Sequence, residues 1–458
     1  MSQMGKDLLL LLPQLIVLLT AVGALVLEML RRPLGSLALL ILGLMAAAGL
    51  SISRLGLETT AFSETFRVDA LSQWAVILLC GATILLALLV RSELCGTGRE
   101  GTVYSLLCFS TLGALLLAGS GDVMLLVLGV LLNSLSGFAL AAYPKTDAAT
   151  EGALKYFVYG SVAGALMVFG LTYWVGLTGS TLLSSLHDPD LSPWALGFGF
   201  VALVAGLGYA ASLFPLHFWT PDTFEGAPVS IAAFLSVIPK VGAMFALAQV
   251  VKELPVAAVN WPLLLAVLAV LAVLSMTFGN VVALWQQHLV RLLAYSTVAQ
   301  AGYFLLGVVA IGQSNLAIDG LVVFSAAYAA MNVGAFAVVL LRGNKLTDYQ
   351  GLGKRSPWPA VALTVFLFSL VGIPPLAGFA GKFLLFSAAI DSHYTWLAVA
   401  AILNSALSLA VYLRVIIPMY GGNASVAQKQ PKLAVAVWAC CLGLTLLLGL
   451  GVQWLLEG

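Results

Sequence analysis

Residues 227–251 read APVSIAAFLSVIPKVGAMFALAQVV, and Lys240 is the only charged side chain among them. A helix needs about 20 apolar residues to cross the hydrocarbon core of a bilayer. In lipid, each backbone group needs a partner within its own segment, whereas the strands of a membrane barrel would alternate apolar and polar residues. This stretch therefore predicts a membrane-spanning helix with a lysine near its middle.

The whole chain repeats this pattern. Of its 458 residues, 61% are hydrophobic and only 9% are charged, whereas a soluble domain carries about 25% charged residues. We therefore expect an all-α polytopic membrane protein with about 14 transmembrane helices. The expected spans lie near residues 8–30, 34–53, 70–90, 102–119, 121–142, 153–176, 194–214, 227–251, 262–285, 290–312, 315–341, 358–380, 394–418 and 432–455.

The composition excludes several functional classes. The 20 Lys and Arg against 19 Asp and Glu give no basis for a nucleic-acid partner or an acidic substrate. We find neither a charged stretch long enough for an extramembrane domain nor a phosphate-binding loop or nucleophile triad, so we expect no catalytic residues in this chain. The cysteines show no metal-ligand spacing, and we expect free thiols and no metal site. They are Cys80, Cys95, Cys108, Cys440 and Cys441.

The distribution of positive charge predicts the orientation, because Lys and Arg are retained on the cytoplasmic side of a membrane. The loops after odd-numbered spans hold 13 Lys and Arg, and the opposite side holds 4. We therefore expect a multi-pass protein of the bacterial inner (plasma) membrane with both termini outside the cytoplasm. The larger group is Arg31, Arg32, Arg91, Arg99, Lys145, Arg291, Arg342, Lys345, Lys354, Arg355, Arg414, Lys429 and Lys432, and the smaller is Lys6, Arg54, Arg67 and Lys252.

Prolines interrupt two of the expected spans. Pro215 lies at the end of the seventh span, and Pro374 and Pro375 lie within the twelfth. Proline removes a backbone hydrogen bond and breaks or kinks a helix, and paired breaks in two halves are typical of inverted-repeat transporters. We therefore expect two inverted five-helix repeats. The expected divisions are three N-terminal helices (1–100), a first repeat of spans 4–8 (101–252), a second repeat of spans 9–13 (253–420) and a C-terminal helix (421–458).

Two lysines inside expected spans are the main candidates for chemistry. A charged lysine at mid-membrane costs about 3 kcal/mol on insertion scales, and burial favours the neutral amine, so Lys240 is suited to take up and release a proton. The competing interpretations are a carboxylate partner or an ammonium that extends to the membrane surface; the distance of Lys240 from both helix ends argues against the latter. Lys382, just after the twelfth-span break, is the candidate for a second protonation site, although it lies nearer a possible interface.

Further polar residues lie near these lysines in the sequence. His217 follows the seventh-span break, and Asp222 and Glu225 come next, suited either to cap the eighth span or otherwise stabilise the fold, or to relay protons. Lys155 is four residues after Glu151 and is expected to pair with it. Tyr295, Ser296 and Gln300, in the tenth span, are suited to hold water in a path or to join helices.

Several motifs in this chain resemble the antiporter-like membrane subunits of respiratory complex I, between about residues 100 and 420. They are ALKYF (153–157), FWTPD (218–222), EGAP (225–228), RLLAYS (291–296), GIPPLAGF (372–379) and GKF (381–383). The resemblance implies proton translocation coupled to quinone reduction elsewhere in the complex. The family's central lysine falls on Lys240 and its twelfth-span lysine on Lys382, with His217, Lys155, Tyr295 and Gln300 completing the expected proton path.

The same resemblance implies partners and cofactors. It implies other membrane subunits of a complex I-type assembly, the lipid bilayer and protons as the transported ion, with no nucleic acid. It places NADH, FMN, iron-sulfur clusters and quinone in other subunits and no cofactor in this chain.

This chain departs from the family pattern at three positions. The fifth-span glutamate falls on Leu131, the seventh-span lysine falls on Ala210, and Gln300 replaces a frequent tenth-span histidine. Because Leu131 and Ala210 hold no charge, the usual proton-loading pair is absent. Two alternatives stand beside the leading one: a subunit of a multisubunit cation/proton antiporter or membrane-bound hydrogenase, which share the same repeat, and a scaffold subunit that does not pump, which the missing charges favour.

Overall fold

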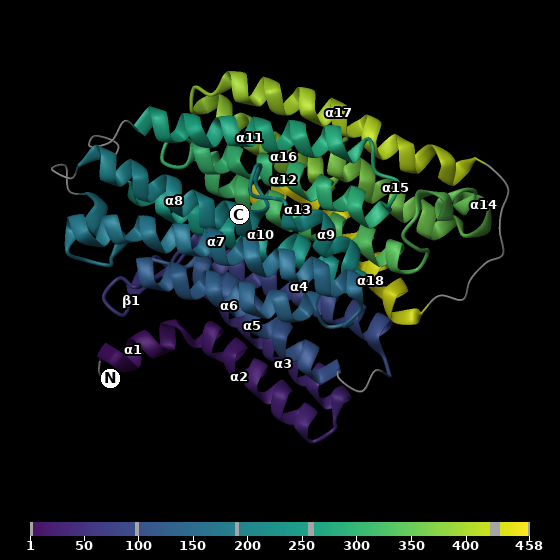
Figure 1. Cartoon of the computed structure of the whole chain (residues 1–458), viewed down its shortest axis with the longest axis horizontal. Coiled ribbons are helices and arrows are strands. Elements are labelled where there is room, and N and C mark those ends of the chain that lie inside the picture. The colour runs from purple at the N-terminus through teal and green to yellow at the C-terminus, as the bar shows by residue number, and fades with distance from the viewer. Residues whose placement is uncertain (1–2, 97–99, 188–191, 255–260, 422–430, 457–458) are drawn as a thin grey trace.

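The computed structural model describes residues 3–96, 100–187, 192–254, 261–421 and 431–456, and these are mostly helical. Long helices lie side by side, and the loops gather at two ends of the bundle (Figure 1). The elements are α1 (Gln3–Leu10), α2 (Leu12–Met29), α3 (Pro33–Ile52), β1 (Thr59–Ala61), β2 (Phe66–Val68), α4 (Ala70–Leu94), α5 (Glu100–Ala118), α6 (Val123–Ala141), α7 (Asp147–Thr178), η1 (Leu183–His187), α8 (Pro193–Ala211), α9 (Trp219–Gly226), α10 (Val229–Glu253), α11 (Trp261–Ala283), α12 (Leu289–Ala310), α13 (Leu316–Leu340), η2 (Leu346–Tyr349), α14 (Leu352–Arg355), α15 (Pro357–Val371), α16 (Ala377–Asp391), α17 (Thr395–Tyr420) and α18 (Lys432–Leu456).

The expected membrane fold is confirmed. Thirteen helices of the described residues are long and apolar enough to cross a membrane, namely α2–α8, α10–α13, α17 and α18. The twelfth expected span is divided into α15 and α16, of 15 residues each. The structure corrects some boundaries: α16 continues to Asp391, beyond the expected end at 380, and Arg291 lies inside α12.

The most buried helix is α10. Its most apolar stretch is completely enclosed by other parts of the protein, and those of α12 and α13 are nearly so, whereas at most a third of the corresponding stretch is buried in α2, α3, α7 and α18. In a membrane protein, exposed apolar side chains face lipid or neighbouring subunits. The lysine of α10 is therefore separated from lipid on every side by protein.

Side chains complete the hydrogen bonding at several helix starts. Asp69 caps α4, Asp122 caps α6 and Thr146 caps α7, each through a side-chain oxygen that accepts from the backbone of the first turn. Pro228 precedes α10 and has no side-chain acceptor; the carboxylate of Glu93, on α4, instead accepts from the N–H groups of Val229 and Ser230 at 2.9 and 2.8 Å.

A short antiparallel hairpin of β1 and β2 covers one end of the bundle and was not expected from the sequence. Its turn contains Phe62, Ser63 and Glu64, all with positive φ. An ion pair of Arg67 with Glu253 joins the hairpin to the last turn of α10. Strands of three residues are too short to leave a period-two signal in an apolar sequence.

The distribution of Lys and Arg predicts which end of the bundle faces the cytoplasm. The hairpin lies at one end, and α14 lies at the opposite end (Figure 1). Arg99 and Lys429, two of the basic residues used for the orientation, lie outside the described residues. Which end faces the cytoplasm stays a prediction.

Candidate functional site

Both proline-containing segments break their helices, as the sequence predicts. The first break follows α8, where Ser212 adopts a left-handed backbone conformation (φ 61°), and contains the cis peptide bond Phe214–Pro215. The second follows α15, where Gly372 (φ 95°) ends the helix, and contains the cis bond Pro374–Pro375. The last carbonyl groups of an interrupted helix lose their helical partners and carry the negative end of its dipole. Each break therefore exposes acceptors within the bundle.

The ammonium of Lys240 lies beside the first break. Lys240 is 1% exposed, and its Nζ donates to Ser212 Oγ (3.0 Å) and to the carbonyl oxygen of Leu235 (3.1 Å). The same Nζ lies 5.1 Å from the ring centre of Trp219 and 5.5 Å from that of Phe224, close enough for cation–π attraction. Within the described residues, its partners are neutral, so the expected alternative of a carboxylate partner is not what the structure shows.

Lys382 lies beside the second break in a closely related way. It is 2% exposed, so the alternative of a lysine that extends to the membrane surface is wrong. Its Nζ donates to the carbonyl oxygens of Leu370 (2.8 Å) and Val371 (3.0 Å), the last residues of α15, and approaches Ser405 Oγ at 3.3 Å. The ring centre of Tyr303 lies 3.8 Å from Nζ.

Buried polar groups of α12 and α13 occupy the space between the two lysines. The hydroxyl of Tyr328 lies 2.9 Å from the carbonyl oxygen of Ser236, one turn before Lys240, and 3.3 Å from Thr297 Oγ1. Asn332 Nδ2 donates to Ser236 Oγ at 2.5 Å. On the other side, Gln300 Nε2 donates to the carbonyl oxygen of Leu370 at 3.1 Å, an acceptor that it shares with Lys382.

Of the polar residues expected in the path, Gln300 is thus joined to Lys382 through a shared acceptor. His217 and Tyr295 are near each other, with ring centres 6.4 Å apart. His217 is buried between Phe214, Phe218 and Phe278. No hydrogen bond among the described residues joins either ring to a lysine of the path.

Lys155 lies in an ionic cluster that joins three helices. Its Nζ is 2.6 Å from both Glu151 Oε1 and Asp222 Oδ2, which confirms the expected pair with Glu151. Arg291 of α12 completes the cluster through Asp222 (2.6 Å) and Glu225 (2.8 Å). The expectation that Asp222 or Glu225 caps the eighth span is wrong: both bind Arg291, and Glu93 is the cap of α10.

Sequence reasoning missed Glu93, Tyr328 and Asn332. Each is a single polar residue within an apolar helix or at its end, and nothing in the local pattern says which helix it faces. The ion pair of Arg291 was missed because the residue was placed outside its helix.

The sequence predicts that the five cysteines are free thiols that bind no metal ion. All five are free thiols, and Cys80, Cys108 and Cys441 are buried. The described part of the chain brings together no group of three or more His, Cys, Asp or Glu side chains suited to a metal ion.

This combination of two broken helices, each followed by a buried lysine, can be compared with known proteins. The sequence model of the family described as NADH:quinone oxidoreductase/Mrp antiporter, TM, matches residues 120–408. The chain belongs to this family.

Members of the NADH:quinone oxidoreductase/Mrp antiporter family match over nearly the whole chain. NADH-quinone oxidoreductase subunit N of Mycobacterium sp. (strain JLS) is 39% identical over 430 residues, covering 90% of this chain and 91% of the relative. F(420)H(2) dehydrogenase subunit N of Methanosarcina mazei is also 39% identical, covering 84% of this chain and 81% of the relative.

Solved structures extend the likeness to the fold. A chain of respiratory complex I from Thermus thermophilus has 30% identity and a TM-score of 0.85, covering 97% of this chain and 99% of the other. A chain of the Mrp complex from Dietzia sp. has a TM-score of 0.86 at 21% identity, covering 98% of this chain and 96% of the other, and is similar in fold alone.

The two positions that the resemblance aligns with the family's charged pair lie in different environments. Ala210 is buried in α8, whereas Leu131 is 50% exposed on the outer surface of α6. Asn133, two residues further along α6, is buried and donates to the carbonyl oxygen of Ser110 at 2.9 Å. In this family member, position 131 therefore faces lipid or a neighbouring subunit.

Proposed function

We propose that this chain is subunit N of a complex I-type NADH-quinone oxidoreductase, a membrane-arm subunit that translocates protons coupled to quinone reduction. The identity of 39% to a subunit N over 90% of the chain supports the assignment. The observation that carries the transport role is that both lysines lie at the C-terminal end of an interrupted helix, Lys240 beside Ser212 and Lys382 beside Leu370 and Val371.

The remaining parts of the reaction belong to other subunits. NADH, FMN, the iron-sulfur clusters and quinone bind elsewhere in the complex, and this chain packs against other membrane subunits in the bacterial plasma membrane. Both termini lie outside the cytoplasm. The two halves that contain the breaks, residues 101–252 and 253–420, are inverted repeats flanked by residues 1–100 and 421–458.

The surroundings of each lysine suit a group that gains and loses a proton. The negative end of a helix dipole stabilises an ammonium, and so does an aromatic face. Backbone carbonyl and hydroxyl oxygens also accept hydrogen bonds from a neutral amine. The Nζ atoms of Lys240 and Lys382 therefore keep their positions in both protonation states, and no fixed carboxylate within the described chain holds either one charged.

The path continues through neutral polar groups. Gln300 shares an acceptor with Lys382, and Tyr328, which contacts Thr297, donates to Ser236 one turn before Lys240; water between Gln300 and Thr297 completes the path. His217 and Tyr295 line the first break, and Lys155, with Asp222 and Arg291, lies at the far end of α9. Protons move along hydroxyl groups and waters by exchange of hydrogen bonds, and the lysines are the groups that store the charge.

The test is the number of protons translocated per quinone reduced, measured with the assembled complex in sealed vesicles. We expect Lys240→Ala to lower this ratio while the complex still assembles and still reduces quinone. Lys252→Ala is the matched control, because Lys252 is on the same helix but pairs with Asp69 at its end. An unchanged ratio for Lys240→Ala in assembled complex contradicts the proposal.

A second candidate function is a scaffold subunit that does not pump. It is favoured by the uncharged Leu131 and Ala210, which remove the pair that loads the family's central site. In that case Lys240→Ala and Lys382→Ala change the amount of assembled complex, and the ratio of protons to quinone stays the same.

A further inference from the structure

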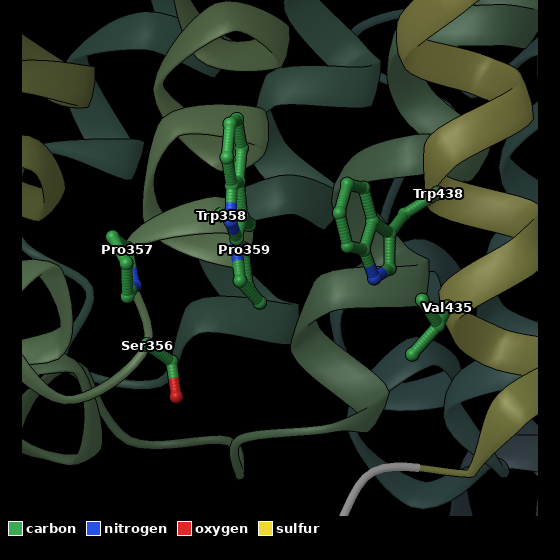
Figure 2. Close-up of a pocket in the computed structure, with 6 residues that line it drawn as sticks. All are labelled: Ser356, Pro357, Trp358, Pro359, Val435 and Trp438. Carbon is green, nitrogen blue, oxygen red and sulfur yellow. The ribbon is translucent and has the colours of Figure 1, made fainter.

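A pocket of ≈ 310 Å³ lies between the start of α15 and the first turns of α18. Figure 2 shows the indole rings of Trp358, from α15, and Trp438, from α18, side by side, with Pro359 below Trp358 and Val435 below Trp438. Ser356 and Pro357 complete the lining. Both helices begin here, so the pocket lies at an end of the bundle, at the depth where a membrane protein meets lipid headgroups.

An unpaired donor faces this pocket. Trp438 is 8% exposed, and its Nε1 has no hydrogen-bond partner among the described residues. Figure 2 shows the nitrogen-bearing edge of the ring turned toward the side where the chain enters α18. A buried indole N–H ordinarily has an acceptor, and the residues that line the pocket supply none.

The start of α15 adds a second, independent attraction for an anion. Its N-cap residue, Ser356, makes no side-chain capping hydrogen bond, and Pro357 and Pro359 have no N–H. The Trp358 N–H is thus the donor that the first turn offers, together with the positive end of the dipole of a 15-residue helix. Backbone N–H groups and the dipole at a helix N-terminus attract phosphate, and here the dipole and one N–H remain.

Basic residues lie at or just before the start of both helices that form the pocket. Lys354 and Arg355 end α14 immediately before Ser356, and Lys432 begins α18 three residues before Val435. Neither residues 349–390 nor residues 431–456 contain an Asp or Glu. Arg342, which is 8% exposed, forms no ion pair with the described residues. Burial lowers the pKa of Arg342, and the positive charge of the nearby Arg355 contributes to lowering it. The described residues of α15 and α18, the two helices that form the pocket, contain no Asp or Glu, and Lys432 brings a positive charge to the start of α18.

We propose that this pocket binds the phosphate of an anionic phospholipid, with the Trp438 indole N–H and the Trp358 backbone N–H as donors and Lys432 as the nearby cation. A lipid fits better than a free ion because the exposed faces beyond the pocket are apolar: Trp358 is 73% and Leu433 38% exposed. The acyl chains lie along α15 and α18, and basic pockets between membrane helices are known to bind such headgroups.

The test counts bound lipid on the intact, partly delipidated complex by native mass spectrometry during titration with phosphatidylglycerol or phosphatidylcholine. We expect phosphatidylglycerol to fill one more site than phosphatidylcholine at equal concentration. Trp438→Phe removes the N–H and keeps the ring; because a hydrogen bond to a charged phosphate is lost, binding of phosphatidylglycerol at this site weakens about tenfold. Trp285→Phe is the matched control, an exposed tryptophan outside the pocket.

Lys432→Gln gives a second readout that does not depend on the buried indole. Lys432 is exposed, so the variant is expected to fold, and removal of one positive charge weakens phosphatidylglycerol binding about fivefold but leaves phosphatidylcholine binding unchanged. Equal occupancy by the two lipids overturns the proposal. Unchanged phosphatidylglycerol binding in both Trp438→Phe and Lys432→Gln also overturns it. Competition by inorganic phosphate as effective as that of the lipid also overturns it, because the pocket is then a site for the free ion.

Discussion

At the residue scale, Lys382 is held by the carbonyl groups that the second helix break leaves without helical partners. This arrangement predicts how two substitutions differ. Lys382→Met removes the titratable group, and Lys382→Arg keeps a positive charge that is not released in proteins. We expect both variants to assemble and both to lower the number of protons translocated per quinone reduced, because transport needs release as well as charge.

The measurement is that ratio in sealed vesicles, with Lys345→Met as a control at an exposed loop position. Full pumping by Lys382→Arg would show that Lys382 supplies only a fixed charge. Because the structure encloses Lys382 as completely as Lys240, we expect effects of similar size at the two positions, and not the weaker effect that its sequence position beside a break suggests.

The two lysines were predictable from the sequence because a charged side chain inside an apolar span is costly. Their partners were not. Tyr328 and Asn332 look like other polar residues of a membrane helix, and their role depends on the packing of α13 against α10 and α12, which local sequence does not encode. The alternatives of a carboxylate partner for Lys240 and an interfacial Lys382 failed for the same reason.

At the element scale, the start of α10 depends on a carboxylate from another helix. Glu93 of α4 accepts from two backbone N–H groups and from Ser230 Oγ at 2.5 Å. We expect Glu93→Gln to destabilise the protein by about 1 kcal/mol, since it removes the charge that complements the helix dipole and one acceptor oxygen. The melting temperature of the complex should fall, and that of the exposed control Glu58→Gln should not. Equal melting temperatures for the two variants would contradict this role of Glu93.

A second element-scale prediction concerns α18 and the twelfth-span break. A Cβ at Gly449 would lie 2.1 Å from the carbonyl oxygen of Pro375 and 2.7 Å from the backbone of Leu376, whereas a Cβ at Gly443, on the same helix, would meet no atom within 4 Å. Gly449→Ala should therefore displace α18 or the break, lower the yield of assembled complex and lower its melting temperature. Gly443→Ala should leave both unchanged, and equal behaviour of the two variants would show that α18 does not pack on the break.

The existence and type of the long elements followed from the sequence, because runs of about 20 apolar residues have few other solutions in a membrane. The hairpin of β1 and β2, the short α1 and the short α9 between the seventh and eighth spans did not follow in detail. Prolines showed where the breaks occur, but where each helix resumes is decided by contacts such as that of Gly449 with Pro375.

At the scale of the whole molecule, the orientation in the membrane is open to a direct test. Cys95 is an exposed thiol in the loop between α4 and α5, on the side predicted to be cytoplasmic. We expect a membrane-impermeant maleimide to label it in inside-out vesicles and not in intact spheroplasts. With Cys95→Ser and Cys440→Ser, a cysteine introduced as Glu58→Cys should show the opposite pattern. Labelling of both positions from the same face would contradict the alternation of the spans.

Lys240 lies near the middle of α10, which spans residues 229–253 and is enclosed by other helices. A full crossing of the membrane by one elementary charge costs or releases about 2.3 kcal/mol per 100 mV of transmembrane voltage. A proton that reaches Lys240 from either side crosses roughly half of that field, about 1.2 kcal/mol per 100 mV. With the cytoplasm negative, the voltage opposes transfer of a proton from the cytoplasm to Lys240 and favours transfer of a proton from outside to Lys240. In the proposed role of Lys240, the membrane voltage therefore opposes outward translocation, which proceeds only while quinone reduction supplies more free energy than this electrical work.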